Sequence, residues 1–335
     1  MNILLASVGR RTYLVDYFKQ ALGESGQVFV ANSSEQTTAF SYADKSVVTP
    51  LIYDETYIPF LLSYCKENKI EAIISLFDID LPILSKNRDK FKNIGVKLIV
   101  SDYEFVSVCN DKWKSYLYLK DKGFNVGKTY ININDVLLAL DNGELTFPII
   151  IKPRFGMGSI GVQIAEDKEE LFYMNRKCQK RIEESYLKYE SAEEENCIIY
   201  QEVLKGQEYG VDIINNLKGE NVAAVVKKKV AMRAGETDIS ETVDEPKLKN
   251  DAVRLGKLTG HIANLDSDWF MVDGVPYILE MNARFGGGYP FSHAAGINLP
   301  LAIVKWLNNE KVDNNLFSYE TGVKAAKEIQ IKILK

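Results

Sequence analysis

The first hundred residues alternate short apolar runs with amphipathic segments. Five runs predict strands and three segments predict helices, the strands at 2–7, 27–31, 46–49, 71–75 and 96–100 and the helices near 11–22, 55–68 and 80–92. This alternation is typical of a parallel sheet with helices on both faces. Because ligands bind beyond the carboxyl ends of parallel strands, the loops after the first and fourth strands are candidate binding loops.

The loop after the first strand carries two arginines at the start of a predicted helix, in the run Ser7-Val8-Gly9-Arg10-Arg11-Thr12. It lacks the full G-x-G-x-x-G pattern of a dinucleotide-binding loop. Cations oppose the helix dipole at this end, so Arg10 and Arg11 favour an anionic substrate nearby. The alternative is a solvated helix start. The loop after the fourth strand carries Asp78 and Asp80.

A second unit begins at Asp111, which is placed as the N-cap of a helix over 111–122. A strand at 147–153 then leads into a glycine-rich run, Lys152-Pro153-Arg154-Phe155-Gly156-Met157-Gly158-Ser159-Ile160-Gly161-Val162. The run predicts a hairpin between two strands, which fits neither a Walker A loop nor a Rossmann turn. We interpret it as a flexible loop over a phosphate chain whose charge Lys152 neutralises. An ordinary hairpin is the alternative.

Similar patterns of apolar and polar residues predict the remaining helices and strands. Residues 167–196 predict a long charged helix whose acidic end, Glu193-Glu194-Glu195-Asn196, is solvated. Further strands are predicted at 197–203, 208–216, 221–231, 264–272 and 275–281, helices at 246–262 and 299–308, and a last strand near 326–333. Lys227 and Lys229 face opposite to Lys228 along their strand, and exposed edge lysines are the alternative to a binding role.

The strand at 275–281 continues into Glu280-Met281-Asn282-Ala283-Arg284 and three glycines. Alternate side chains of a strand share a face, so Glu280, Asn282 and Arg284 are expected together. Carboxylate and amide oxygens suit Mg²⁺, and a guanidinium suits a phosphate or acyl-phosphate oxygen. Asp268 on the preceding strand is a candidate third ligand, or else flanks a turn with Asp266. A polar edge strand facing water is the alternative for the whole run.

Composition narrows the class of protein. The chain has 335 residues, 46% of them hydrophobic and 26% charged, which is enough for two or three lobes. Its net charge of −5 argues against nucleic acid as a partner. No apolar run has the length of a membrane span, and no signal peptide is evident, so a cytoplasmic protein with reduced cysteines is expected. The two histidines, His261 and His293, lie in no nucleophile motif.

Taken in order, these motifs resemble the ATP-grasp superfamily over nearly the whole chain, and they are similar to one half of the carbamoyl-phosphate synthase large subunit. The resemblance implies a mixed α/β and α+β fold. A Rossmann-like parallel-sheet domain is expected over 1–110, a small ATP-grasp lobe with the glycine loop over 111–200, and a large lobe with the metal site over 201–335. ATP and Mg²⁺, or Mn²⁺ in its place, are the implied cofactors, and a homodimer is the implied assembly.

The resemblance also assigns roles to individual residues. Lys112 and Lys152 resemble the basic pair on the ATP phosphates, and Gly156, Gly158, Ser159 and Gly161 resemble the phosphate lid. Glu202 with the backbone of Val203 and Leu204 resembles the adenine-binding hinge, and Glu208 the ribose ligand. Glu280 and Asn282 resemble the metal ligands and Arg284 the phosphoryl-holding arginine. Trp269 stands where the synthase has its third metal ligand, and Asp268 beside it is expected to face away unless the register differs.

The implied activity is an ATP- and Mg²⁺-dependent ligase. It would activate a small-molecule carboxylate as an acyl-phosphate for attack by an amine or similar nucleophile, which needs charge neutralisation and alignment more than covalent catalysis. Lys152, Arg284 and Arg233 are the expected catalytic residues, and the substrate is expected at Arg10, Arg11, Lys229, Arg233 and Gly287. A nucleotide-binding sensor or scaffold without turnover, hinted at by Trp269, and a small-molecule kinase are the alternatives.

Overall fold

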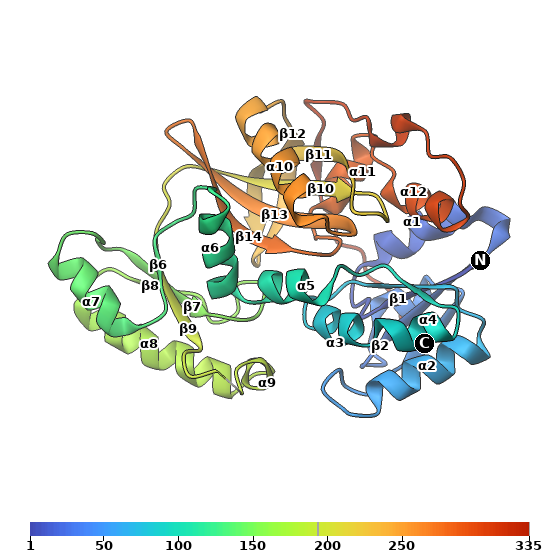
Figure 1. Ribbon diagram of the computed structural model, residues 1–335, viewed down its shortest axis with the longest axis horizontal. Coiled ribbons are helices and arrows are strands. Elements are labelled where there is room, and N and C mark those ends of the chain that lie inside the picture. Colours follow the sequence, from blue (N-terminus) through green and yellow to red (C-terminus); the bar gives the residue numbers. More distant parts are fainter. Residues whose placement is uncertain (193, 335) are drawn as a thin grey trace.

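The computed structural model describes residues 1–192 and 194–334 and folds the chain around three sheets (Figure 1). The first is a five-stranded parallel sheet in the order β3-β2-β1-β4-β5. The second has four strands in the order β6-β9-β7-β8, and the third has six in the order β14-β13-β10-β11-β12-β15. Pairing in the second and third sheets is antiparallel. The expected fold class is confirmed.

The parallel sheet and its helices occupy the N-terminal third of the chain. Its strands are β1 (Asn2–Ala6), β2 (Gln27–Asn32), β3 (Lys45–Val48), β4 (Ala72–Ser75) and β5 (Lys97–Leu98). Its helices are α1 (Thr12–Leu22), α2 (Tyr57–Glu67), α3 (Asp80–Lys86), α4 (Arg88–Asn93) and α5 (Tyr103–Asn110), with short 3₁₀ turns at Gly23–Ser25 and Thr38–Ser41. The helix predicted over 80–92 is two helices, because the backbone leaves helical geometry at Asn87 (φ −104°, ψ 12°).

Both faces of the parallel sheet are buried, as parallel strands require. Leu4 of β1 belongs to a core that also contains Val211 and Trp269 of the six-stranded sheet. Leu5 faces the other way, into a core shared with Ile214 and with helix α12 (Leu299–Leu307). The N-terminal sheet and the six-stranded sheet are therefore joined by two shared cores.

The four-stranded sheet belongs to a lobe with its own core. Its elements are α6 (Lys112–Asp121), β6 (Thr129–Tyr130), α7 (Ile133–Asp141), β7 (Ile149–Pro153), β8 (Gln163–Ala165), α8 (Lys168–Glu183), α9 (Leu187–Glu190) and β9 (Ile198–Glu202). The helix predicted over 167–196 is wrong beyond Glu183, where the chain turns before α9. The acidic run is not simply solvated, because Glu194 pairs with the Arg154 guanidinium at 2.7 Å, while Glu193 lies outside the described residues.

Helix α9 connects this lobe to the N-terminal sheet. The Tyr53 hydroxyl donates to the Glu190 carboxylate at 2.9 Å, and the Asn110 side-chain amide donates to its other oxygen at 2.6 Å. The Tyr53 and Tyr189 rings stack with their centroids 4.7 Å apart. The glycine loop lies against the same helix, because a Cβ on Gly156 would come within 2.5 Å of the Leu187 side chain.

The six-stranded sheet completes the molecule. Its elements are β10 (Gln207–Asn215), β11 (Asn221–Arg233), β12 (Glu236–Thr242), α10 (Pro246–Thr259), β13 (Ala263–Val272), β14 (Val275–Asn282), α11 (Tyr289–Ala294), α12, a 3₁₀ turn at Asn314–Phe317 and β15 (Lys324–Ala326). The strand predicted near 326–333 is wrong, since β15 ends at Ala326 after pairing with β12. The helix predicted over 246–262 ends at Thr259, where Gly260 turns left-handed (φ 54°).

The division at residues 110 and 200 remains a proposal. The three sheets follow those limits closely, but α6 packs against β14 of the six-stranded sheet, and the Ile278 N–H donates to the Asn125 carbonyl at 2.9 Å. The segment that opens the expected small lobe thus rests on the large lobe. Among the described residues, no helix combines the length and apolar character that a membrane span requires.

The pH dependence of folding is a first prediction. His261 is buried just beyond α10, its Nε2 2.9 Å from the Ile213 carbonyl and its Nδ1 2.8 Å from the Thr259 hydroxyl. Burial lowers the pKa of His261 to about 4. The unfolded chain takes up a proton below its ordinary pKa, so this stabilisation is present above about pH 6.5 and is lost as pH falls toward about 4.

The matched variant is His261→Gln, which can still donate to the Ile213 carbonyl. We expect the stability advantage of the wild type over this variant to shrink by roughly 2 kcal/mol between about pH 7 and about pH 5. Urea unfolding at the two pH values measures it. An advantage that is independent of pH would contradict a neutral buried imidazole.

Candidate functional site

A cleft of about 370 Å³ lies where the three sheets meet, within the size range of small-molecule sites. The N-terminal unit contributes Arg11, which is half-buried. One wall is β7 with the glycine loop after it, and the floor is one face of the six-stranded sheet. Because three units line it, the cleft depends on how they pack together.

The floor is set by the register of β13 against β14. Asp268 pairs with Glu280 and Asp266 with Asn282, and residues directly opposite in an antiparallel pair share a face. All four side chains line the cleft. A β-bulge follows, since Trp269 pairs with Ile278 and leaves one residue of β14 unpaired.

The expected orientation of Asp268 is wrong, because it is Trp269 that turns away from the cleft. The Trp269 side chain is fully buried in the core, and its indole N–H donates to the Ser267 hydroxyl at 2.8 Å. The reading of Asp266 and Asp268 as turn residues is also wrong, since both lie within β13. Burial raises the pKa of Asp268 to about 6, although the neighbouring Lys229 lowers it.

Lys227 is buried and Lys228 and Lys229 are partly buried, because β11 lies between β10 and β12 and is not an edge strand. Lys229 binds the Glu208 carboxylate at 2.6 Å and the Asp268 carboxylate at 2.7 Å. Burial opposes its charge, but these two carboxylates outweigh it and raise the pKa of Lys229. Gly210, opposite Lys227 and Asp268, leaves the space in which these side chains cross.

Arg284 is held by carboxylates from two different units. Its Nε donates to Asp78 at 2.9 Å, from the loop after β4, and its Nη1 donates to Asp266 at 3.0 Å. Burial disfavours the charge, yet the two carboxylates raise the pKa of Arg284 and keep it cationic. Over residues 1–192 and 194–334, Nη2 has no partner, so one edge of the guanidinium can bind a ligand anion.

Two lysines face this floor across the cleft. Lys152 on β7 is buried, and its Nζ donates to the Gln201 side chain at 2.9 Å. Burial, helped by the nearby Lys112, lowers the pKa of Lys152 to about 8. Lys112 opens α6, donates to the Gly156 carbonyl, and lies 3.8 Å from Glu280.

The start of α6 is fixed by a buried ion pair. The Asp111 carboxylate caps the helix by accepting from the backbone N–H of Lys114 and Trp113, and it binds Arg154 through two hydrogen bonds of 2.6 and 2.8 Å. Arg154 directly follows β7, and its carbonyl accepts from the Lys112 N–H at 3.0 Å. Lys112 and Lys152 therefore have a common support.

The glycine loop forms the hairpin that the sequence predicts, with Ile149 opposite Ala165. Gly156, Gly158 and Ser159 line the cleft and have positive φ angles (94°, 63° and 60°). Gly161 does not line the cleft. It lies against Pro153, only 3.0 Å from where a Cβ would sit.

Several predicted site residues are not brought to the cleft. Glu202, the last residue of β9, and Val203 and Leu204 after it do not line the cleft, and the Glu202 carboxylate accepts from the Lys128 N–H at 2.7 Å. Arg10 is exposed. Arg233 ends β11 with its side chain 54% exposed and bound to Asp238 at 2.8 Å. Arg11, Lys229 and Gly287 do line the cleft.

The structure adds residues to the site that sequence reasoning missed. Asp266 and Lys227 line the cleft, and a two-residue period could have found them, because each lies two positions from a predicted site residue on the same strand. Glu236 also lines it and binds Lys327 at 3.0 Å. That pair joins β12 to the residue after β15, which no local pattern indicates.

The oxygen ligands fit a divalent ion only together with a substrate. No group of three or more histidine, cysteine, aspartate or glutamate side chains in the described part of the chain is arranged to hold a metal. Asp268 and Glu280 supply two carboxylates on one face, and Asn282 adds an amide oxygen. Mg²⁺ commonly binds one or two carboxylates and completes its shell with phosphate oxygens and water.

Two family models match most of the chain between them. Residues 3–99 match the model described as PylC-like, N-terminal domain, and residues 194–330 match the one described as ATP-grasp in the biosynthetic pathway with Ter operon. The resemblance to the ATP-grasp superfamily is confirmed, because the model that matches residues 194–330 is an ATP-grasp model.

Curated relatives of this chain include much longer proteins. The carbamoyl phosphate synthase large chain of Clostridium perfringens (strain 13) is 23% identical over 328 residues, which are 93% of this chain and 29% of that protein. The corresponding protein of Clostridium botulinum (strain Kyoto) is 21% identical over 321 residues, which are 92% of this chain and 28% of that protein. The chain thus spans less than a third of the length of these relatives.

Solved structures show the same fold. The biotin carboxylase β,γ-ATP complex from Campylobacter jejuni is similar with a TM-score of 0.73 and 17% sequence identity. The match covers 95% of this chain and 73% of the carboxylase chain. N5-carboxyaminoimidazole synthetase from Staphylococcus aureus, complexed with ADP, has a TM-score of 0.72 and 15% sequence identity. That match covers 93% of this chain and 78% of the synthetase chain. The L-amino acid ligase from Bacillus licheniformis has a TM-score of 0.70 and 18% sequence identity, with the same coverage of the two chains.

Neighbouring glycines after β14 provide a test of this geometry. A Cβ on Gly286 would lie 2.0 Å from Cγ of Asp266, whereas one on Gly287 would have no atom nearer than 3.5 Å. We expect Gly286→Ala to displace Asp266 from Arg284 and to cost about 1–3 kcal/mol of stability. Gly287→Ala is the control and should stay within about 0.5 kcal/mol of wild type. Thermal unfolding measures both, and equal effects would contradict the close packing of Gly286 on Asp266.

Proposed function

We propose that this protein is an ATP- and Mg²⁺-dependent ligase that activates a small-molecule carboxylate as an acyl-phosphate for attack by an amine or similar nucleophile. The observation that carries the proposal is the cleft itself. Carboxylate and amide oxygens on its floor face two lysines and a glycine loop on its wall, with Arg284 beside them. The neighbours named as a carboxylase, a synthetase and an amino acid ligase support a ligase reading.

The nucleotide is proposed to lie between the β7 wall and the floor. Lys112 and Lys152 would neutralise its phosphates, and the loop from Gly156 to Ser159 would cover them. Apolar side chains, Ile150 and Leu279 among them, line the cleft and suit an adenine ring. Glu208 is proposed for the ribose. Residues 202–204 are proposed to bind the edge of the adenine ring, because they lie in the connection from β9 to β10.

Asp268, Glu280 and Asn282 are proposed to hold the Mg²⁺. When bound, the ion would supply charge neutralisation for the phosphates. Arg284 lines the same cleft, and its Nη2, which has no partner among the described residues, would bind the phosphoryl group as it moves. Lys229 lies between the Asp268 and Glu208 carboxylates and binds both, which offsets the repulsion between them.

The chemistry runs in two balanced steps. A carboxylate oxygen of the substrate attacks the γ-phosphorus, the bond from that phosphorus to the β-phosphate bridging oxygen breaks, and ADP leaves. The nucleophile then attacks the acyl carbon, the carbon–oxygen bond to phosphate breaks, and an attacking amine loses a proton. Neither step needs a protein nucleophile. This agrees with His261 lying in the core and with His293 stacked on Tyr17 at a centroid distance of 3.7 Å.

The substrate is proposed at the end of the cleft nearest the N-terminal unit. Arg11 lines this end, and in the part of the chain described its side chain has no ion-pair partner. Glu236, Lys327 and Gly287 meet beside it, since a Cβ on Gly287 would lie 3.5 Å from the Lys327 Nζ. Arg11 can hold an anionic substrate group, whereas Lys327, Lys229 and Arg233 already bind carboxylates.

The alternative of a nucleotide-binding sensor or scaffold without turnover has no supporting observation in the structure. Trp269 was the one hint of a degraded metal site, and the structure places it in the core with Asp268 in the cleft. The products of the reaction distinguish a ligase from a kinase. A kinase releases a stable phosphorylated compound, and a ligase releases phosphate and a joined product.

A product assay tests the proposal. ADP and phosphate should appear only when a suitable acid and a suitable amine are both present, and Glu280→Ala should lower turnover by about 100-fold or more without unfolding the protein. Glu220→Ala, in the exposed turn between β10 and β11, is the matched control. Nucleotide binding without ADP formation across a broad panel of acids and amines would count against a ligase, as would full turnover by Glu280→Ala.

A further inference from the structure

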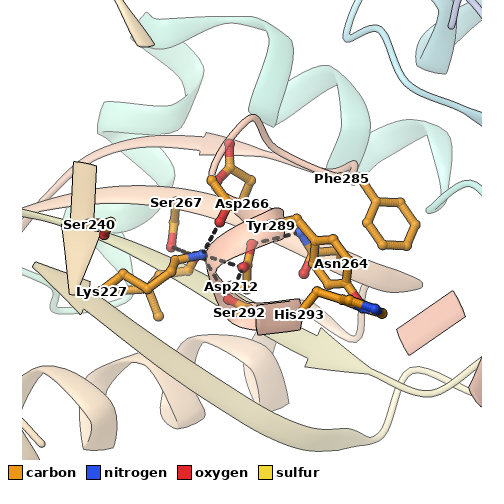
Figure 2. A network of polar contacts seen from close by, with 12 residues as sticks. Asp212, Lys227, Ser240, Asn264, Asp266, Ser267, Phe285, Tyr289, Ser292 and His293 are labelled. Atoms are coloured by element: carbon orange, nitrogen blue, oxygen red, sulfur yellow. Dashed lines mark hydrogen bonds and ion pairs between the residues drawn. The ribbon is translucent and has the colours of Figure 1, made fainter. Parts of the chain in front are cut away.

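A buried polar network lies beneath the turn that follows β14 (Figure 2). The Lys227 ammonium binds the Asp212 carboxylate, the Ser292 hydroxyl at 3.0 Å and the Gly288 carbonyl at 3.3 Å. Asp212 accepts a second short hydrogen bond from the Ser292 hydroxyl. At 0–2% exposure, Asp212, Lys227 and Ser292 are removed from solvent. The ammonium has three acceptors for its three protons, so it has none left for a substrate anion.

The network holds both ends of one turn. Asn264 donates to the other oxygen of Asp212 at 3.0 Å and to the Arg284 carbonyl at 3.2 Å. Lys227 holds the Gly288 carbonyl at the far end. Three central strands, β10, β11 and β13, thus fix the backbone on either side of residues 285–287.

Such support matters because the turn is rich in glycine. It contains Gly286, Gly287 and Gly288 in succession, and glycine has more conformational freedom to lose than any other residue. The turn also carries Arg284 and lines the substrate end of the cleft. A displacement of about 1 Å at a reacting group can cost on the order of 100-fold in rate.

We propose that Lys227, Asp212, Ser292 and Asn264 form a clamp that positions Arg284 and the glycine turn for phosphoryl transfer. Lys227 is then a positioning residue and not a phosphate or substrate ligand, although it lines the cleft. The proposal rests on the ligase function inferred above, and it adds a specific role for a buried ion pair. It predicts that breaking the clamp lowers kcat more than it changes nucleotide affinity.

The test removes both charges at once. In Asp212→Asn/Lys227→Met the side chains keep their size and no unpaired charge is left buried. We expect amide hydrogen exchange in residues 284–289 to rise by about 10-fold or more, while exchange in β7 stays unchanged. The Kd for ATP analogue with Mg²⁺ should stay within about two-fold, and kcat should fall roughly 10- to 100-fold with KM for ATP little changed.

Matched variants keep the test decisive. Lys228→Met carries the same substitution on the opposite face of β11 and should match wild type in every measurement. Ser292→Ala, which removes one arm of the clamp, is used if the double variant does not fold, and it should raise exchange in the turn to a smaller extent. Wild-type exchange in 284–289 for the double variant, or for Ser292→Ala in its place, would overturn the clamp.

The exchange measurement needs no substrate, so it is independent of the ligase proposal. If the wild type forms no product with any acid and amine but the turn still loosens in the variant, the proposed function fails and the structural clamp stands. If the wild type is active and the loosened variant keeps its full kcat, the positioning role is overturned and the ligase function stands.

Discussion

The register of β13 against β14 is the constraint on which the site depends. It places Asp268 opposite Glu280 and Asp266 opposite Asn282, so that all four side chains face the cleft. A slip of β14 by one residue would move Glu280 and Asn282 to the other face, away from Asp266 and Asp268. The register is secured from the core side, where Trp269 and Ile278 are buried opposite each other beyond the bulge. The packing of apolar residues thus determines where the polar ones lie.

Charge balance follows from that register and ties the three units together. The carboxylates of the floor would repel one another, and each is neutralised by a cation from another element, Lys229 from β11 and Lys112 from α6. Arg284 in turn is held by Asp78 of the N-terminal unit and Asp266 of β13. Removing one partner from such a buried pair is costly, so the elements that meet at the cleft stabilise one another there.

Local patterns predicted most of the longer strands, the glycine hairpin and the shared face of Glu280 and Asn282, because each depends on residues close in sequence. The orientation of Asp268 was not predictable in this way, since it depends on a bulge in a neighbouring strand. Arg233 has the charge of a site residue but is drawn to Asp238 by the turn it precedes. The pairing of β15 with β12 and the position of Lys327 likewise arise from contacts distant in sequence.

The central claim is that a nucleotide triphosphate lies between the glycine loop and the floor of the six-stranded sheet. Calorimetric titration of a non-hydrolysable ATP analogue, with and without Mg²⁺, tests this claim most directly, with Lys152→Met as the comparison. We expect one site per chain, tighter binding with Mg²⁺, and affinity lower by about 10-fold or more in the variant. Absence of binding to the folded wild type, or equal affinity in Lys152→Met, would contradict it.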